Sequence, residues 1–197
     1  MSRPLLVVLG AVVFALMSVI FFWIFKLTLA NSMKTDMVSP EKVAAFIQAL
    51  LEANRNNYTD NVVVKLQKEG IQAHEHWKDE RGVALPAQYL MESGRLVSLK
   101  DLKFSFRLAS LTPIYVWNGP NSDFERLGLA AVDKNPEKPH YGYITKGGTR
   151  YFQAIYADRA GSQACVDCHN QHANSPRRDF KLNDVMGGIV ITFPVGE

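Results

Sequence analysis

An uninterrupted apolar segment near the amino terminus constrains this chain more than any other feature. The 21 residues from Leu5 to Phe25 contain no charged side chain and no proline. As a helix they would be roughly 31 Å long at about 1.5 Å per residue, enough to cross the hydrocarbon core of a bilayer. We therefore expect residues 1–30 to form one membrane anchor, which contacts lipid through residues 5–25.

A cleavable signal peptide is the alternative interpretation of this segment. Thr28, Leu29 and Ala30 resemble a small-residue cleavage site. The apolar region of a signal peptide is usually only about 7–15 residues long, however, which favours the anchor. Both interpretations send residues 31–197 across the membrane.

The charge of the remaining chain argues against a nucleic-acid partner. The formal net charge is +3, and Arg3 and Lys26, which flank the apolar segment, supply two of these charges. The other Lys and Arg residues are scattered among Asp and Glu rather than clustered. A protein that binds a phosphate backbone normally carries a basic patch, so we expect no nucleic acid to bind.

The patterns after the anchor predict a polar linker over residues 31–40 and one α+β domain over residues 41–197. Apolar residues with helical spacing predict a long helix that begins at Ser39 and Pro40 and ends near Gly70. Alternating and hairpin patterns predict strands that connect as an antiparallel sheet. The other expected elements are a loop over 71–84, a helix from Pro86 to Ser93 ended by Gly94, a strand over 102–108, a helix over 123–132, a hairpin over 141–156 and a strand over 186–193.

One polar residue interrupts the apolar face of the long predicted helix. Asn54 falls between Leu50 and Tyr58 on that face, and Arg55 lies next to it. Asn54 could cap a neighbouring loop through a buried hydrogen bond. Alternatively, Asn54, Arg55 and Tyr58 could line a cofactor pocket.

The run Cys165-Val166-Asp167-Cys168-His169 carries the strongest chemical signal in the chain. A c-type haem is attached by two thiols that add to its vinyl groups, and the histidine that follows the second cysteine ligates the iron. The spacing therefore predicts one covalently attached haem c, with His169 as the proximal iron ligand.

Three other chemistries use the same residue types. The two cysteines, which are the only ones in the chain, could form a disulfide in an oxidising compartment. A thioredoxin-type redox pair normally opens a helix after a strand of an α/β unit, which the flanking residues do not suggest. A zinc site could use Cys165, Cys168, His169 and His172, but structural zinc sites usually separate the two ligand pairs by about a dozen residues.

The segment from Cys165 to Gly187 resembles the signature of a bacterial haem-c family that was catalogued as a domain of unknown function. Shorter matches lie at Arg55–Val62, Leu85–Ala87 and Asn121–Glu125. The resemblance implies a PAS-like fold, found free-standing or as the extracytoplasmic part of signalling proteins. It also implies a haem pocket closed by the long first helix, which makes Arg55 and Tyr58 pocket candidates. Asn183 departs from the family pattern, which has Gly there, but Asn is the next most tolerant residue for a left-handed backbone.

The ligand on the far side of the iron is the open question of the sequence. A thiolate is excluded because the chain has no third cysteine. His140 follows a proline-rich connection and could fold over the haem as the sixth ligand. An open site gated by Tyr58 and Arg55 is the leading interpretation, with His140 as an alternative to it. The other candidates are His74, His76, His172, Met33, Met37, Met91 and Met186.

Axial ligation separates the function classes that the sequence leaves open. We expect a single-pass protein of a bacterial inner membrane whose haem domain lies in the periplasm and exchanges electrons with a membrane or periplasmic redox protein. The alternative is a sensor of redox state or of a small diatomic ligand such as NO, CO or O2, acting through a membrane partner. The sequence shows no paired carboxylates and no nucleophile–base arrangement, so we expect a carrier or sensor rather than an enzyme.

Overall fold

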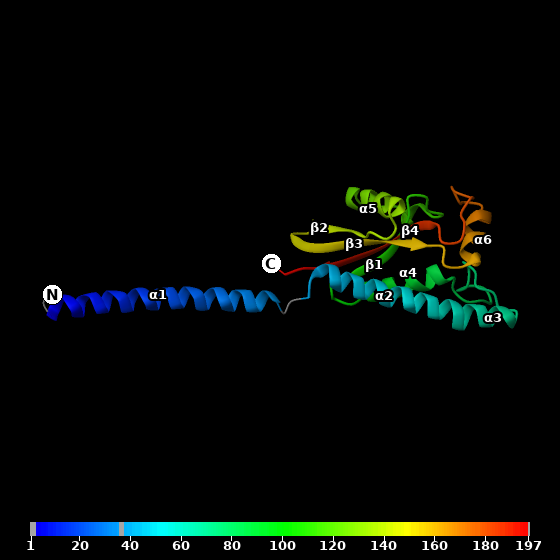
Figure 1. The fold of residues 1–197 in the computed structure, drawn as a ribbon. Coiled ribbons are helices and arrows are strands. Elements are labelled where there is room, and N and C mark those ends of the chain that lie inside the picture. The colour runs from blue at the N-terminus through cyan, green and yellow to red at the C-terminus, as the bar shows by residue number, and fades with distance from the viewer. Residues whose placement is uncertain (1–2, 36–37, 197) are drawn as a thin grey trace. The chain divides into compact units, whose positions relative to one another are not determined.

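A computed structural model describes residues 3–35 and 38–196 of the chain (Figure 1). The chain divides into two compact units, residues 1–39 and residues 40–197. Each unit is described by itself below.

The first unit is a single helix, α1 (Arg3–Thr35). Its segment Val12–Leu29 is long and apolar enough to cross a membrane, with a mean hydropathy of 2.3, and its side chains are exposed. The helix continues five residues into the segment that we expected to be a linker, because no glycine or proline occurs between Gly10 and Pro40. Met37 lies outside the described residues.

The long predicted helix opens the second unit and contains a local irregularity. It comprises α2 (Pro40–Tyr58), a π-helical turn η1 (Thr59–Val63) and α3 (Val64–Lys68). Gly70 follows with a φ of +78°, a left-handed conformation that commonly ends helices. The predicted extent to about Gly70 is confirmed. The π-helical turn was not predicted, and such turns often occur near functional sites.

The next helix runs further than the sequence suggested. We expected Gly94 to end it, but α4 (Pro86–Ser98) continues through that residue. Gly94 is buried, and a Cβ atom there would lie 2.5 Å from the carbonyl oxygen of Phe106. The glycine therefore allows α4 to approach the neighbouring strand closely, and its role is in packing rather than in ending the helix.

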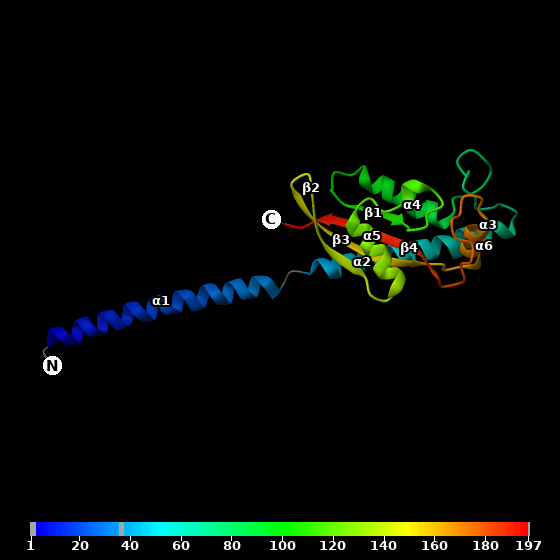
Figure 2. The same ribbon diagram turned by 90° about the horizontal axis from the view of Figure 1, so that it is seen from above.

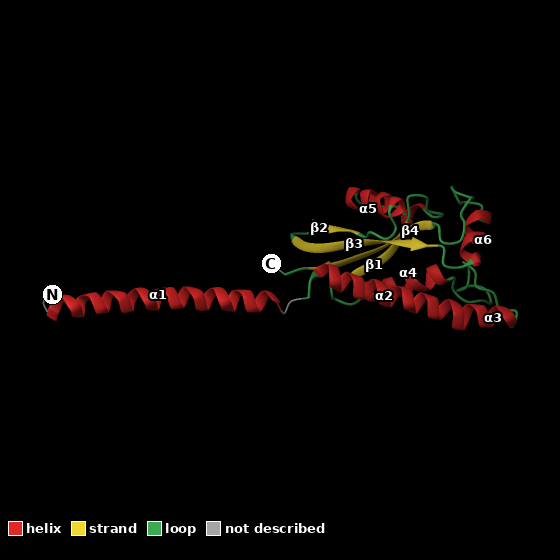
Figure 3. Ribbon diagram, viewed as in Figure 1, coloured by secondary structure: helices red, strands yellow, loops and turns green. Residues whose placement is uncertain are grey.

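The four strands form one antiparallel sheet in the order β1-β4-β3-β2 (Figure 3). The predicted hairpin joins β2 to β3 through Gly147 and Gly148, which both have positive φ as a tight turn requires. The α+β class and the antiparallel sheet are confirmed. The strands are β1 (Ser105–Ala109), β2 (His140–Lys146), β3 (Thr149–Arg159) and β4 (Val185–Pro194).

Helices cover both faces of the sheet (Figures 1 and 2). On one face α5 (Asp123–Lys134) packs Leu129 and Val132 against Ile155. On the other face α2 and α4 contribute to a core around Leu90 and Ile191. Ser122 caps α5 by accepting a hydrogen bond from the backbone N–H of Glu125 at 3.2 Å.

A last helix, α6 (Gln163–Gln171), lies beyond the carboxyl end of β3 (Figure 1). The chain returns from α6 to β4 through a turn in which Asn183 has a φ of +70°. The expectation that Asn183 would keep the left-handed turn is therefore confirmed. The backbone N–H of Asn183 donates to the carbonyl of Ala160 at 3.0 Å, which ties the two ends of the α6 segment together.

Candidate functional site

Helix α6 carries the two thiols and the imidazole of the motif. Cys165, Cys168 and His169 are spaced i, i+3 and i+4, so they lie on one face of the helix. All three residues are intermediate in burial, whereas Asp167 between them is exposed. Both cysteines are free thiols, and burial raises the pKa of the Cys168 thiol. The helix thus presents two thiols and one imidazole together.

The imidazole of His169 is half-buried and has an unsatisfied nitrogen. Its Nδ1 atom is shielded from solvent and has no hydrogen-bond partner among the described residues. Burial lowers the pKa of His169, which favours the neutral ring that can bind a metal. The ring of Phe180 meets it edge-on at 5.6 Å between centroids. An unpartnered buried nitrogen is uncommon, and a bound group or an ordered water would satisfy it.

A pair of hydrogen bonds fixes Phe180 beside this imidazole. The Asn170 side chain donates to the carbonyl of Phe180 at 2.9 Å, and the Phe180 backbone N–H donates to Asn170 at 3.0 Å. Phe180 also packs with Val166 and Met186 in a small buried cluster. The loop after α6 is therefore held against the helix, and the histidine ring has a rigid wall on one side.

An ion pair from the long helix lies near the first thiol. A guanidinium nitrogen of Arg55 lies 2.6 Å from Oδ1 of Asp158 at the end of β3, and the two side chains are only 16% and 15% exposed. Burial by itself lowers the pKa of Arg55, but the attraction of Asp158 raises it. Cys165 adds a smaller upward contribution, so the net pKa shift of Arg55 is upward. Asp158 also acts electrostatically on His169. Arg55 is thus brought to the motif.

The other two pocket candidates of the long helix face α4. Tyr58 donates to the carbonyl of Ala84 at 2.9 Å and stacks on Tyr89 with a centroid separation of 4.1 Å. Asn54 is exposed and accepts a hydrogen bond from Tyr89 at 2.9 Å, so it does not form the buried loop cap that we considered. A cofactor-binding role for Asn54 and Tyr58 stays a prediction.

A second polar cluster lies near the second thiol. Glu75 accepts a short hydrogen bond from Tyr115, and a carboxylate oxygen lies 3.3 Å from Nε2 of His172. The Tyr115 and His172 rings meet edge-on at 5.9 Å. The hydrogen bond to Glu75 raises the pKa of Tyr115 to about 12, and the charge of Cys168 adds a small part of that shift. Three loops therefore converge on this side of α6.

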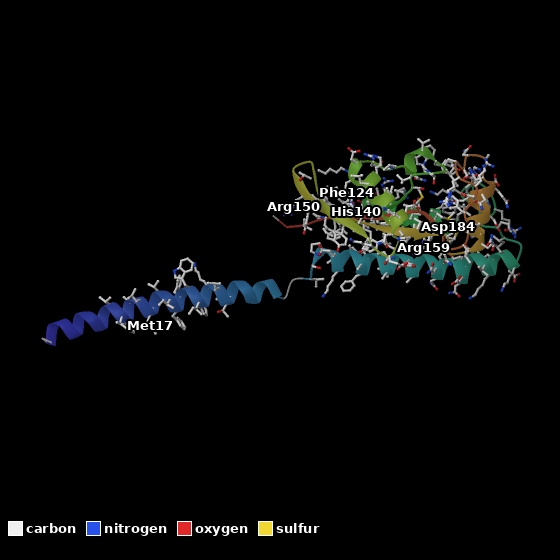
Figure 4. The ribbon with its side chains drawn as sticks, turned by 45° about the horizontal axis from the view of Figure 1, so that its top comes forward. Met17, Phe124, His140, Arg150, Arg159 and Asp184 are labelled. Carbon is white, nitrogen blue, oxygen red and sulfur yellow. The ribbon has the colours of Figure 1, made fainter. Side chains whose placement is uncertain are left out.

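The structure places His140 apart from this cluster. His140 begins β2 and its ring packs against Phe124 of α5 at 4.8 Å (Figure 4). A Cβ atom at Gly128 would meet the His140 ring at 2.8 Å, which shows how closely α5 covers it. The structure does not bring His140 together with α6, and its role as sixth ligand stays a prediction.

The remaining candidate ligands are scattered. His172 is half-buried beside Glu75, and Met186 is buried in the Phe180 cluster. His76 is exposed, and His74 lies within 3.4 Å of the carbonyl of Arg81. No group of three or more His, Cys, Asp or Glu side chains within residues 3–35 and 38–196 is arranged to hold a metal ion by itself.

Sequence reasoning missed four residues that shape this site. They are Glu75, Tyr115, Asp158 and Phe180. Tyr115 and Glu75 come from loops without a regular pattern, and Asp158 looked like an ordinary polar residue at a strand end. Only Phe180, an isolated aromatic residue in a polar segment after the motif, gave a signal that could have been noticed.

The donor set of the site fits a haem better than a bare metal ion. Two free thiols and an imidazole with one unpartnered nitrogen, all on one helix face, are the groups that a covalently bound haem requires. The structural class is therefore an α+β domain, with an antiparallel sheet and a helix that bears two cysteines and a histidine. An apolar helix precedes this domain in the chain.

The chain belongs to the Tll0287-like family, whose model matches residues 33–194. The family is known for a haem-binding domain in Tll0287. The matched range covers residues 40–194 of the second unit, including α6 and the residues around it. No curated protein matches the chain.

Proposed function

We propose that this protein is a membrane-anchored c-type cytochrome with one haem, held by thioether bonds to Cys165 and Cys168 and ligated by His169. We further propose that it transfers electrons on the periplasmic side of a bacterial inner membrane and that its domain is PAS-like. The observation that carries the proposal is the half-buried imidazole of His169, with its unpartnered Nδ1 atom, beside two free thiols on one face of α6.

The alternatives from the sequence fit this helix less well. Cys165 and Cys168 are free thiols rather than a disulfide. A zinc ion needs about four converging ligands, and His172 is directed to Glu75 instead. Cys165, Cys168 and His169 would hold a haem, which would supply one-electron redox chemistry, the chemistry of an electron carrier.

The residues around α6 have distinct roles in this proposal. The burial of His169 lowers its pKa and so favours the neutral ring, the form that can ligate iron. The Arg55 guanidinium supplies a fixed positive charge beside Cys165, partly neutralised by Asp158. Phe180 excludes water from one side of the imidazole. A low-dielectric setting of this kind limits solvent reorganisation when the charge of the iron changes.

One observation favours a sensor as the second candidate. The π-helical turn η1 follows Tyr58 in the long helix. In the sequence, this helix begins shortly after the anchor ends. Turns of this type often occur at functional sites, so ligand binding near Arg55 or Tyr58 could alter the long helix. NO, CO or O2 would be the ligand, and a membrane partner would receive the signal.

Attachment is tested by expressing the full chain in a host that attaches haem c. We expect the wild-type protein to keep its haem through denaturing gel electrophoresis, and the double variant C165S/C168S to lose it. H169A should keep covalent haem but show an altered axial-ligand spectrum. D167A is the matched control, because Asp167 lies between the cysteines but is exposed. Wild-type protein without bound haem would overturn the proposal.

A further inference from the structure

One carboxylate beside α6 joins three loops that are far apart in sequence. Glu75, in the loop before α4, accepts a short hydrogen bond from the hydroxyl of Tyr115. Tyr115 immediately precedes the 3-10 turn η2 (Val116–Asn118). His172, in the loop after α6, places its Nε2 atom 3.3 Å from the same carboxylate oxygen. The carboxylate is therefore held by side chains from two other segments of the domain.

The backbone at Glu75 is fixed as well as its side chain. The Gln88 side chain of α4 donates to the carbonyl of Glu75 at 2.9 Å. The preceding residue, His74, donates its backbone N–H to the carbonyl of Val83 at 3.1 Å, which closes the loop on itself. A charged group that is held in place in this way acts on a neighbouring redox centre without having to reorganise.

Both side chains that hold the carboxylate do so as uncharged donors. The Nδ1 atom of His172 accepts the backbone N–H of Asn174 at 3.1 Å. A ring nitrogen that accepts a hydrogen bond carries no proton, so the proton of the neutral ring lies on Nε2, which faces Glu75. The hydrogen bond to Glu75 raises the pKa of Tyr115 to about 12, so the phenol also keeps its proton. The two donors stabilise the anion without cancelling its charge.

The negative charge of Glu75 is present at neutral pH. The hydrogen bond from Tyr115 is the largest cause that lowers the pKa of Glu75; burial opposes it, and the contact with His172 lowers the pKa further. Among the residues that the structure describes, the ion contacts recorded for this carboxylate are with histidines, His76 at 3.5 Å and His172 at 3.3 Å. The carboxylate thus keeps its charge without a recorded lysine or arginine partner in that part of the chain.

This charge acts on the second cysteine of the motif. His172 donates its backbone N–H to the carbonyl of Cys168 at 2.9 Å, at the end of α6. Burial is the main cause that raises the pKa of Cys168, and the charge of Glu75 is the next. Coulomb interactions fall only gradually with distance, so a charge that acts on this sulfur also acts on a haem attached to it.

We propose that Glu75 sets the reduction potential of the haem, because its fixed negative charge favours the oxidised iron and so lowers the potential. Tyr115 and His172 hold the carboxylate in the position from which it acts. This inference rests on the proposed function, because it requires a haem on α6. The oxidised iron carries one more positive charge than the reduced iron, and the electron passes between the iron and the redox partner. A neighbouring anion therefore stabilises the oxidised form more than the reduced form.

The test is the midpoint potential of the full chain in lipid nanodiscs, obtained at pH 7 from the haem absorbance as redox mediators titrate the protein. E75Q keeps the shape of the side chain and removes its charge. We expect E75Q to raise the ratio of reduced to oxidised protein about tenfold at a fixed potential, which is about 59 mV for a one-electron couple. E75D keeps the charge and should stay near the wild-type potential. E75A removes the charge and the hydrogen bonds together, and it should shift the potential in the same direction as E75Q.

D79N is the matched control for the loss of one negative charge. Asp79 lies four residues after Glu75 in the same loop, but it is exposed whereas Glu75 is half-buried. Solvent and salt screen an exposed charge much more than a partly buried one. We therefore expect D79N to have the wild-type potential.

The outcomes separate this inference from the proposed function. A wild-type chain without haem absorbance would contradict the proposed function itself. A haem whose potential is the same in wild type and E75Q, or in wild type and E75A should E75Q fail to fold, would overturn the role of Glu75 alone. Equal shifts in E75Q and D79N would overturn it as well, because the cause would then be the net charge of the domain. An E75D variant that shifts as far as E75Q would show a role in shape rather than in charge and would also overturn it.

Discussion

At the scale of single residues, His169 and the two thiols depend on neighbours from distant parts of the chain. Phe180 forms one wall beside the imidazole, and Asp158 and Arg55 place opposite charges near it. The thiols and the histidine could be predicted because their spacing is fixed by haem chemistry. The roles of Asp158 and Phe180 could not be predicted, because they arise only when the sheet and the loop after α6 fold together.

Glu75 and Tyr115 give a residue-scale prediction about pH. The hydrogen bond to Glu75 raises the pKa of Tyr115 to about 12 from an ordinary value near 10. A raised folded-state pKa stabilises the fold fully below the ordinary value, and this stabilisation is lost as the pH rises through about 10 to 12. We therefore expect E75Q to lower the pKa of Tyr115 and to remove that part of the alkaline stability loss.

The measurement is the ultraviolet absorbance of tyrosinate as a function of pH in the full chain. The difference between wild type and Y115F isolates Tyr115 from the other tyrosines. In the E75Q background, the absorbance difference between E75Q and E75Q/Y115F should show that Tyr115 ionises at a lower pH. An unchanged Tyr115 titration in E75Q would show that the Glu75 carboxylate does not raise the pKa of Tyr115.

At the scale of elements, the helical and alternating patterns predicted most of the core. The long helix, the hairpin and the strand that ends the domain occur where their periodicity indicated. The π-helical turn, the 3-10 turn and α6 lack a strong periodic pattern because they are short and partly exposed. The predicted end of α4 at Gly94 was wrong, because a glycine gives the same local sequence pattern whether it ends a helix or allows close packing.

Gly94 supplies the element-scale prediction. G94A adds a methyl group 2.5 Å from the carbonyl oxygen of Phe106, so α4 must move away from β1. We expect the free energy of unfolding to fall by roughly 1–3 kcal/mol, as overpacked core positions do. Urea unfolding monitored by circular dichroism measures the change.

The control for that prediction is Gly161, which has no heavy atom within 4 Å of the position of a Cβ atom. G161A should be neutral or slightly stabilising, because alanine restricts the unfolded chain. Equal stability of G94A and wild type would mean that the contact between α4 and β1 tolerates extra volume. The glycine would then have no packing role.

At the scale of the whole molecule, the chain combines an apolar helix with one α+β domain of the Tll0287-like family. The class of the domain and the apolar helix could be predicted from composition and pattern, because both depend on long segments. The convergence of the 71–85 loop, the Tyr115 loop and α6 depends on tertiary contacts between residues far apart in sequence. No local pattern encodes that convergence.

The optical spectrum of the reduced full chain, recorded before and after the addition of CO, tests the proposed electron carrier most directly. We predict haem bands of a low-spin cytochrome that remain with the polypeptide after acid–acetone extraction and do not change with CO, because an electron carrier holds its iron between two strong ligands. Bands that shift with CO would contradict the carrier and favour the sensor. Absence of haem bands would contradict haem binding altogether.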